Sequence, residues 1–165
     1  MLVYLAARFS RFDDLNRCRE ELTELGIEVT SRWLDGGHEW VGTPDDEIPV
    51  DELRRFATED IDDILAADLV ICFTEPPKSG PARGGRHFEA GFALAMGMPV
   101  LCVGYVENVF YSLESIIFQP TWDDALAWLQ IALRTWHPVP IWAQYEPNRL
   151  MMIGPSWHES AELVP

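Results

Sequence analysis

Short apolar runs alternate with amphipathic stretches of helical spacing along this chain, and this alternation constrains the fold more than any other feature. The apolar runs predict strands over residues 2–7, 27–33, 68–74, 99–104 and 115–119. The stretches between them predict helices over residues 11–25, 50–67, 85–97 and 121–136. Strands that alternate with helices indicate an α/β fold with a parallel sheet. Right-handed crossovers then give a doubly wound, flavodoxin-like sheet of five strands with helices on both faces.

Local signals mark the ends of two helices. Ser10 is predicted to cap the first helix and Gly26 to end it. Thr121 is predicted to cap the last helix. These signals place residues 1–136 in one α/β domain. Residues 137–165 form a tail rich in Pro and Trp, which is too apolar for a typical disordered tail and is expected to pack on the domain or on a neighbouring subunit.

Composition excludes several classes of function. A formal charge of −15 argues against a nucleic-acid-binding surface, which needs a basic footprint. No apolar run approaches the roughly 20 residues that span a bilayer. Residues 1–7 lack a preceding basic region, so they are interpreted as a first strand instead of a signal peptide, and a cytoplasmic location is expected.

The sequence predicts no cofactor and no metal. Cys18, Cys72 and Cys102 are odd in number and widely spaced, which favours buried thiols in a reducing compartment. The four histidines show no metal-ligand spacing. The chain also lacks the Gly-x-Gly-x-x-Gly, P-loop and Gly-x-Ser-x-Gly motifs of dinucleotide-binding, NTPase and α/β-hydrolase proteins.

The run at residues 84–93 is predicted to open the third helix and to place Glu89 near its N-terminus. The helix dipole favours negative charge there, so we expect Glu89 to be ionised at neutral pH. A carboxylate at the carboxyl edge of a parallel sheet is well placed to attack or stabilise a cationic sugar carbon. The alternative is that Glu89 only matches the dipole of its own helix.

Asp60 and Tyr4 are the next candidates. Asp60 lies four residues after Phe56 and four before Ile64, so it is predicted on the apolar stripe of its helix, whereas Asp62 and Asp63 are predicted to face water. An inward carboxylate is costly unless it is paired or used, so Asp60 is either functional or pairs with an Arg or a backbone amide. Tyr4 is either a core tyrosine or a hydroxyl that holds the Glu89 carboxylate.

Candidate substrate-binding residues follow the first, third and fourth strands, at the edge where open α/β sheets bind ligands. They are Ala7, Arg8, Phe9, Ser10, Gly85, Arg86 and Asn108. Arg8, Arg11, Arg83 and Arg86 flank the same strand ends, where they are either phosphate ligands or solvated surface charges. Phe9 or Trp40 can stack on a base or pack locally, and Asn108 is either a turn residue or a substrate contact.

Four segments together resemble the nucleoside 2-deoxyribosyltransferase superfamily, which includes nucleoside 5′-monophosphate N-glycosidases. They are residues 3–7, 59–68, 85–93 and 98–101, and the resemblance extends from the start of the chain to about residue 110. The resemblance implies that Glu89 attacks C1′ of a (deoxy)ribose to give a covalent glycosyl intermediate, that Asp60 assists protonation of the leaving base, and that Tyr4 orients Glu89. It also implies a homo-oligomer in which Asn108 reaches a neighbouring subunit's site.

The sequence departs from the family in two places. The loop at residues 78–83 is basic, where transferases of the family often carry an acidic residue. Arg8 and Ser10 resemble the phosphate-holding loop of the monophosphate hydrolases only loosely, and Ala7 replaces a Gly. The function predicted is cleavage or transfer at the N-glycosidic bond of a small-molecule nucleoside or nucleotide. The alternatives are a nucleoside 5′-monophosphate N-hydrolase, a phosphoribohydrolase and a non-catalytic nucleotide-binding sensor.

Overall fold

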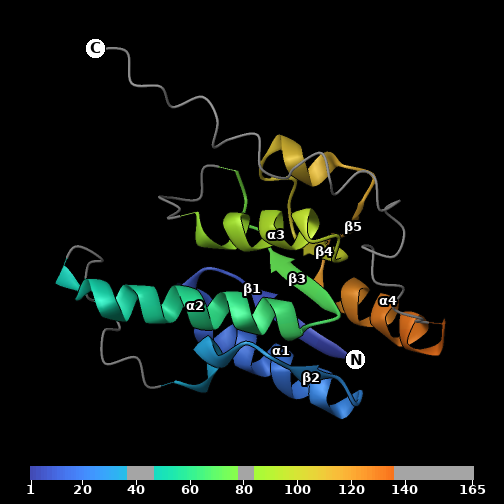
Figure 1. The fold of residues 1–165 in the computed structure, drawn as a ribbon. Helices are drawn as coiled ribbons and strands as arrows, with labels where there is room; N and C mark the ends of the chain where they lie inside the picture. Colours follow the sequence, from blue (N-terminus) through green and yellow to red (C-terminus); the bar gives the residue numbers. More distant parts are fainter. Residues whose placement is uncertain (37–46, 78–83, 136–165) are drawn as a thin grey trace, which may run out of the picture.

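A computed structural model describes residues 1–36, 47–77 and 84–135. Five parallel strands form one sheet in the order β2-β1-β3-β4-β5, as Figure 1 shows for the central strands. The strands are β1 Leu2–Ala6, β2 Glu28–Val29, β3 Leu69–Phe73, β4 Val100–Val103 and β5 Ile116–Gln119. This strand order is that of a flavodoxin-like sheet, so the predicted fold class is confirmed.

The described residues form four α-helices, of which three connect successive strands and the fourth follows β5, and each lies within a few residues of its predicted bounds. They are α1 Phe12–Glu24, α2 Val50–Ala66, α3 Gly85–Ala95 and α4 Trp122–Thr135. Within the described residues, short 3₁₀ turns lie before α1 at η1 Phe9–Arg11, after β2 at η2 Arg32–Asp35, and between β4 and β5 at η4 Val109–Ser112. None of the helices in the described ranges combines the length and the apolarity that a bilayer-spanning helix needs.

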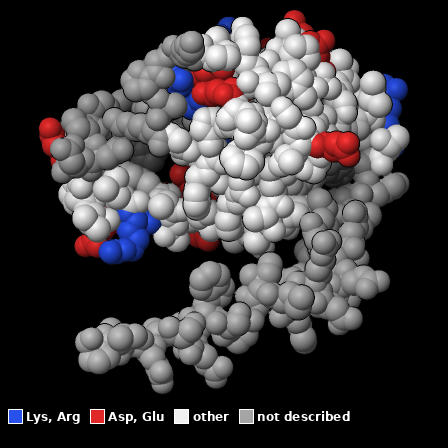
Figure 2. Space-filling view, turned by 90° about the horizontal axis from the view of Figure 1, so that it is seen from above, with Lys and Arg blue, Asp and Glu red and all other residues white. Residues whose placement is uncertain are grey.

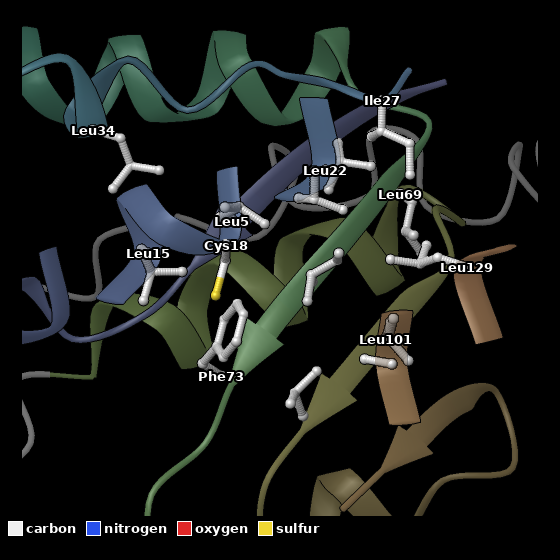
Figure 3. Packing of buried hydrophobic residues seen from close by; sticks show 14 residues of the cluster. Leu5, Leu15, Cys18, Leu22, Ile27, Leu34, Leu69, Phe73, Leu101 and Leu129 are labelled. Carbon is white, nitrogen blue, oxygen red and sulfur yellow. The ribbon is translucent and has the colours of Figure 1, made fainter. Parts of the chain in front are cut away.

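The sheet is covered on both faces, which explains why β3 is apolar throughout. Side chains alternate across a strand, so Leu69, Ile71 and Phe73 enter one core and Val70 and Cys72 enter the other. All five are buried, as a central strand of a parallel sheet requires. The first core packs α1 and α4 against the sheet (Figure 3). The second core packs α2 and α3 against the opposite face.

Polar groups are buried on the second face of the sheet, which makes this face the candidate for a functional site. Tyr4 of β1 is fully buried there among aliphatic side chains from α2 and α3. Arg86 of α3 and Asp63 of α2 are also buried. Because a buried polar group needs a partner or a use, this face is where chemistry is expected.

Two local predictions about the N-terminal half are wrong. Ser10 lies inside η1, and α1 begins after Arg11 with no side-chain cap. The second strand is two residues long instead of seven. Beyond these two residues, side chains take the place of further backbone pairing with β1. Ser31 Oγ accepts a hydrogen bond from the Leu5 N–H at 2.7 Å, and the Trp33 indole N–H donates one to the Leu5 carbonyl at 2.9 Å.

Two predicted helix signals are confirmed. Gly26 ends α1 with a φ of +75°, a left-handed conformation that glycine adopts without the strain of a Cβ atom. Thr121 Oγ1 accepts a hydrogen bond from the Asp124 N–H at 3.1 Å and so caps α4. The predicted tail at residues 137–165 and the predicted ligands Trp40 and Arg83 lie outside the described residues.

Candidate active site

The candidate site lies at the point where the strand order reverses. The chain passes from β1 to β2 on one side and reaches β3 on the other, so β1 and β3 are neighbours whose following loops diverge. Ligands of open α/β sheets bind in the crevice at the carboxyl ends of such strands. Residues 7–10 follow β1 at this edge, and Thr74 and Glu75 follow β3.

Three elements bring Tyr4, Asp60 and Glu89 together. Tyr4 comes from β1, Asp60 from α2 and Glu89 from α3. The Tyr4 hydroxyl is buried and makes no hydrogen bond of ordinary geometry, but it lies close enough to the Asp60 and Glu89 carboxyl groups to lower the pKa of each. Burial, followed by the charges of Glu89 and Asp60, raises the pKa of Tyr4 well above its ordinary value. Tyr4 therefore keeps its proton and faces two carboxyl groups as a potential donor.

The Glu89 carboxyl group is protonated at neutral pH in this ligand-free site. Burial, followed by the charge of Asp60, raises the pKa of Glu89 to about 8, and Tyr4 and Arg86 oppose that rise only in part. The expectation of an ionised Glu89 is therefore wrong. Glu89 is the fifth residue of α3, beyond the first helical turn, where the dipole effect fades and desolvation dominates.

Asp60 is the more acidic member of this pair. Burial raises the pKa of Asp60 to about 6, while the Tyr4 hydroxyl lowers it and the charges of Asp63 and Glu59 raise it. Two neighbouring carboxyl groups resist losing both protons, because each charge disfavours the other. At pH 7 the pair holds about one proton, mostly at Glu89.

Asp63, one turn further along α2, does not face water as predicted. It is buried and accepts hydrogen bonds from the Arg32 backbone N–H at 2.8 Å and from Arg32 Nε at 2.7 Å. Arg32 arrives from η2, a segment distant in sequence, so the pattern of α2 alone did not reveal this partner. The bonds tie α2 to the segment after β2.

Gly85 keeps one side of Glu89 uncovered. A Cβ atom built on Gly85 would lie 3.8 Å from Glu89 Oε1, one helical turn away. At this distance a Cβ atom would make an ordinary van der Waals contact with the carboxyl group. A role of Gly85 in binding substrate stays a prediction.

The loop after β1 presents an aromatic cluster beside the switch point. Phe9 is 44% exposed and its ring centroid lies 6.0 Å from that of Phe12 and 6.1 Å from that of Trp33. Arg8 is half-buried, and its charge contributes to lowering the pKa of His87, after the larger effects of burial and Arg86. The structure thus places the predicted loop next to the start of α3, whereas Ser10 is exposed.

Two predicted ligands already have partners within the protein. Arg86 is buried and its Nη2 pairs with Glu107 Oε1. Asn108 Oδ1 accepts a hydrogen bond from the Phe110 N–H at 3.0 Å and caps η4. Contact of either residue with a substrate stays a prediction.

Glu107, His87 and Tyr111, which the sequence pattern did not single out, form a polar cluster with Arg86. Their signal was available, since Glu107 directly precedes Asn108 in the segment after β4. The described residues contain no group of three or more His, Cys, Asp or Glu side chains placed to hold a metal ion. All three cysteines are buried and free, as predicted.

The fold and the buried carboxyl pair define a doubly wound α/β protein with its site at the switch point between β1 and β3. No protein-family model matches the chain, and no curated protein matches it. Several solved structures are similar to it. A 2-deoxyribosyltransferase from Bacillus psychrosaccharolyticus is 18% identical with a TM-score of 0.55, covering 76% of this chain and 90% of its own.

A conserved protein from Enterococcus faecalis V583 is 16% identical with a TM-score of 0.52, covering 81% of this chain and 98% of its own. The Clostridium botulinum CMP N-glycosidase BcmB is 21% identical with a TM-score of 0.49, covering 79% and 98%. At these identities the two structures with TM-scores of 0.55 and 0.52 establish a shared fold and no more. The expected resemblance to the nucleoside 2-deoxyribosyltransferase superfamily is thus confirmed at the level of the fold.

Proposed function

We propose that this protein breaks or exchanges the N-glycosidic bond of a (deoxy)nucleoside or its 5′-monophosphate. The observation that carries the proposal is the convergence of Glu89, Asp60 and the buried Tyr4 hydroxyl at the switch point. A buried pair of carboxyl groups with separated pKa values suits glycosyl chemistry, which needs one group to attack and another to move a proton. The shared fold with a 2-deoxyribosyltransferase supports this choice of bond.

In the proposed reaction, a Glu89 carboxylate oxygen attacks C1′ of the sugar. The bond between C1′ and the base nitrogen breaks, and its electron pair leaves with the base. Asp60 delivers a proton to the base as it departs. Water or a second base then attacks C1′ and releases Glu89, which gives hydrolysis or transfer respectively.

The proton shared by the two carboxyl groups suggests how the attack begins. In the ligand-free protein this proton lies mostly on Glu89, but only the ionised Glu89 carboxylate can attack C1′. Transfer of this proton to Asp60 would ionise Glu89 and leave Asp60 protonated, so that Asp60 can act as the general acid for the departing base. The elevated pKa of Asp60, about 6, keeps it able to hold a proton near neutral pH. Tyr4 would donate a hydrogen bond to the ionised Glu89.

A chromatographic assay identifies the substrate and shows whether the reaction is hydrolysis or transfer. Purified protein is incubated with deoxynucleosides, ribonucleosides and their 5′-monophosphates, each with and without a second free base. A new nucleoside would identify a deoxyribosyltransferase, and free base with sugar phosphate from monophosphates alone would identify a nucleotide N-hydrolase. Silence across the panel would remove the proposal and favour a nucleotide-binding sensor.

The role of Glu89 is tested by trapping the intermediate. A 2′-fluoro nucleoside slows formation and breakdown of a cationic sugar, so the adduct accumulates and mass spectrometry of peptides locates it. We expect the sugar on Glu89 and none in Glu89→Gln. An adduct on Asp60 would exchange the two roles and refute the assignment.

Phosphate recognition has weaker support than the glycosyl chemistry. Arg86 pairs with Glu107, and Arg11 lies 3.7 Å from Glu75 and over the Phe73 ring. These contacts engage two of the predicted phosphate ligands with groups of the protein itself. The panel described above compares nucleosides directly with their monophosphates.

A homo-oligomer is also part of this proposal. Seen from above, charged side chains are separated by a broad uncharged area (Figure 2). Phe88 of α3 and Val109 and Phe110 of η4 are 66%, 79% and 68% exposed, and exposed apolar patches often mark protein contacts. Gel filtration should therefore give a species larger than the 18.8 kDa chain.

A further inference from the structure

Glu107 connects three segments that meet beside the candidate site. It lies between β4 and η4. Its Oε2 accepts a hydrogen bond from the Glu75 backbone N–H at 3.1 Å, just after β3. Its Oε1 pairs with Arg86 Nη2 and lies 3.7 Å from His87 Nε2, both in the first turn of α3. One carboxylate thus joins the end of β3 to the beginning of the helix that carries Glu89.

Arg86 depends on this carboxylate. Its side chain is only 2% exposed, and its Nε is buried without a hydrogen-bond partner. A buried guanidinium group is costly unless a carboxylate compensates its charge. Although burial opposes ionisation, hydrogen bonds from Arg86 and from the Glu75 backbone lower the pKa of Glu107, so the carboxylate is charged at neutral pH.

A second contact fixes the same helical turn. Tyr111 of η4 is buried, and its hydroxyl lies 2.7 Å from His87 Nδ1 and 3.2 Å from Cys72 Sγ. Asn108 caps η4 and so helps to hold Tyr111 in place. The segment 107–111 therefore holds the first turn of α3 through two side chains, Glu107 and Tyr111.

Arg86 provides the positive charge near Glu89. The charged and titratable groups that face Glu89 are Tyr4 from β1, Asp60 from α2, Cys72 from β3 and Arg86 from α3 itself; the Cys72 thiol is neutral, because burial raises its pKa to about 12. Asp60 favours the protonated form of Glu89, while Arg86 favours the ionised form. The position of Arg86 therefore affects how readily Glu89 loses its proton.

We propose that Glu107 is a positioning residue, which clamps the first turn of α3 to the end of β3 and thereby keeps Arg86 buried beside Glu89. The inference rests on the proposed function only in treating Glu89 as the reacting group. The placement itself is independent of any activity. Loss of Glu107 should let the Arg86 side chain leave its buried position and turn toward water.

The test is a titration of Glu89 in the ligand-free protein. Carboxyl-labelled glutamate is followed by ¹³C NMR against pH, and Glu89→Gln assigns the signal. Arg86→Met should move the Glu89 midpoint upward by at least about half a pH unit, because it removes the nearby positive charge. Glu107→Gln should move it in the same direction, and Arg86→Met with Glu107→Gln should equal Arg86→Met alone. Glu114→Gln, at an exposed position, is the matched control.

Several outcomes would overturn the inference. A downward shift in Glu107→Gln would mean that Arg86 keeps its place without Glu107. A midpoint equal to that of Glu114→Gln, or additive shifts in the double variant, would mean that Glu107 does not act through Arg86. If Glu107→Gln does not fold, the measurement is made on the double variant Arg86→Met with Glu107→Gln, which buries no unpaired charge. A Glu89 midpoint equal to that of the wild type in this double variant overturns the inference.

Activity gives a second readout once a substrate is known. Glu107→Gln should lower kcat at least about tenfold with little change in KM, because it changes how readily the reacting group Glu89 ionises and removes no binding contact. An equal loss in Glu114→Gln would refute that role. If the wild-type protein turns over no substrate, the proposed function fails while the titration still decides the inference.

Discussion

Glu89→Gln should stabilise the protein, and the gain should grow as the pH rises. Burial raises the pKa of Glu89 from 4.5 to about 8. Between these two values the unfolded chain loses the Glu89 proton but the folded chain retains it. A raised carboxyl pKa therefore contributes stability that is complete below pH 4.5 and is lost as the pH rises through about 8.

The magnitude follows from the two pKa values. At 1.36 kcal/mol per pKa unit, the full difference corresponds to roughly 5 kcal/mol above pH 8, and to about 3 kcal/mol at pH 7. A glutamine at this position carries no such dependence and has nearly the same shape. Relative to wild type, Glu89→Gln should thus gain little near pH 4.5 and about 3 kcal/mol at pH 7.

The assay is urea denaturation of both proteins at several pH values from 4.5 to 8.5. Glu114→Gln, at an exposed position, controls for replacing any glutamate. A difference between Glu89→Gln and wild type that stays constant with pH would refute the reasoning. A difference that grew toward acid would show that Glu89 is ionised in the folded protein, in agreement with the dipole expectation.

Four further predictions test the backbone of the fold and the surroundings of the site. Gly104→Ala should cost at least about 2 kcal/mol, because its Cβ would lie 2.7 Å from the Thr74 carbonyl oxygen at a φ of +118°. Gly26→Ala, with a φ of +75° and nothing within 4 Å, should cost only about 1 kcal/mol in the same urea experiment. Asp63→Ala should cost about 3 kcal/mol in thermal or urea unfolding, because two hydrogen bonds to Arg32 are lost, and a cost below about 1 kcal/mol would contradict this. Tyr4→Phe should change stability by less than about 1 kcal/mol, since the hydroxyl makes no hydrogen bond of ordinary geometry, yet lower kcat if it donates to ionised Glu89; unchanged kcat would remove that role.

Local chemistry predicted most of the helices and strands. Helical periodicity located α1 to within a residue at each end, and the apolar run at residues 68–74 located β3. Gly26 and Thr121 act through their immediate neighbours, so their sequence signals were sufficient. Ser10 failed as a cap because η1 intervenes before α1, and the second strand ended early because Ser31 and Trp33 side chains replace its ladder.

Some features of the candidate site were likewise predictable from the sequence, and others were not. The sequence by itself determined the alternation of strands and helices, and with it the edge of the sheet where Glu89, Asp60 and the loop after β1 gather. Only the tertiary structure decided the charge of these groups, because desolvation depends on what packs around a side chain and not on its neighbours in sequence. It also decided the partners of Asp63 and Arg86, which come from segments about 20 to 30 residues away in the chain.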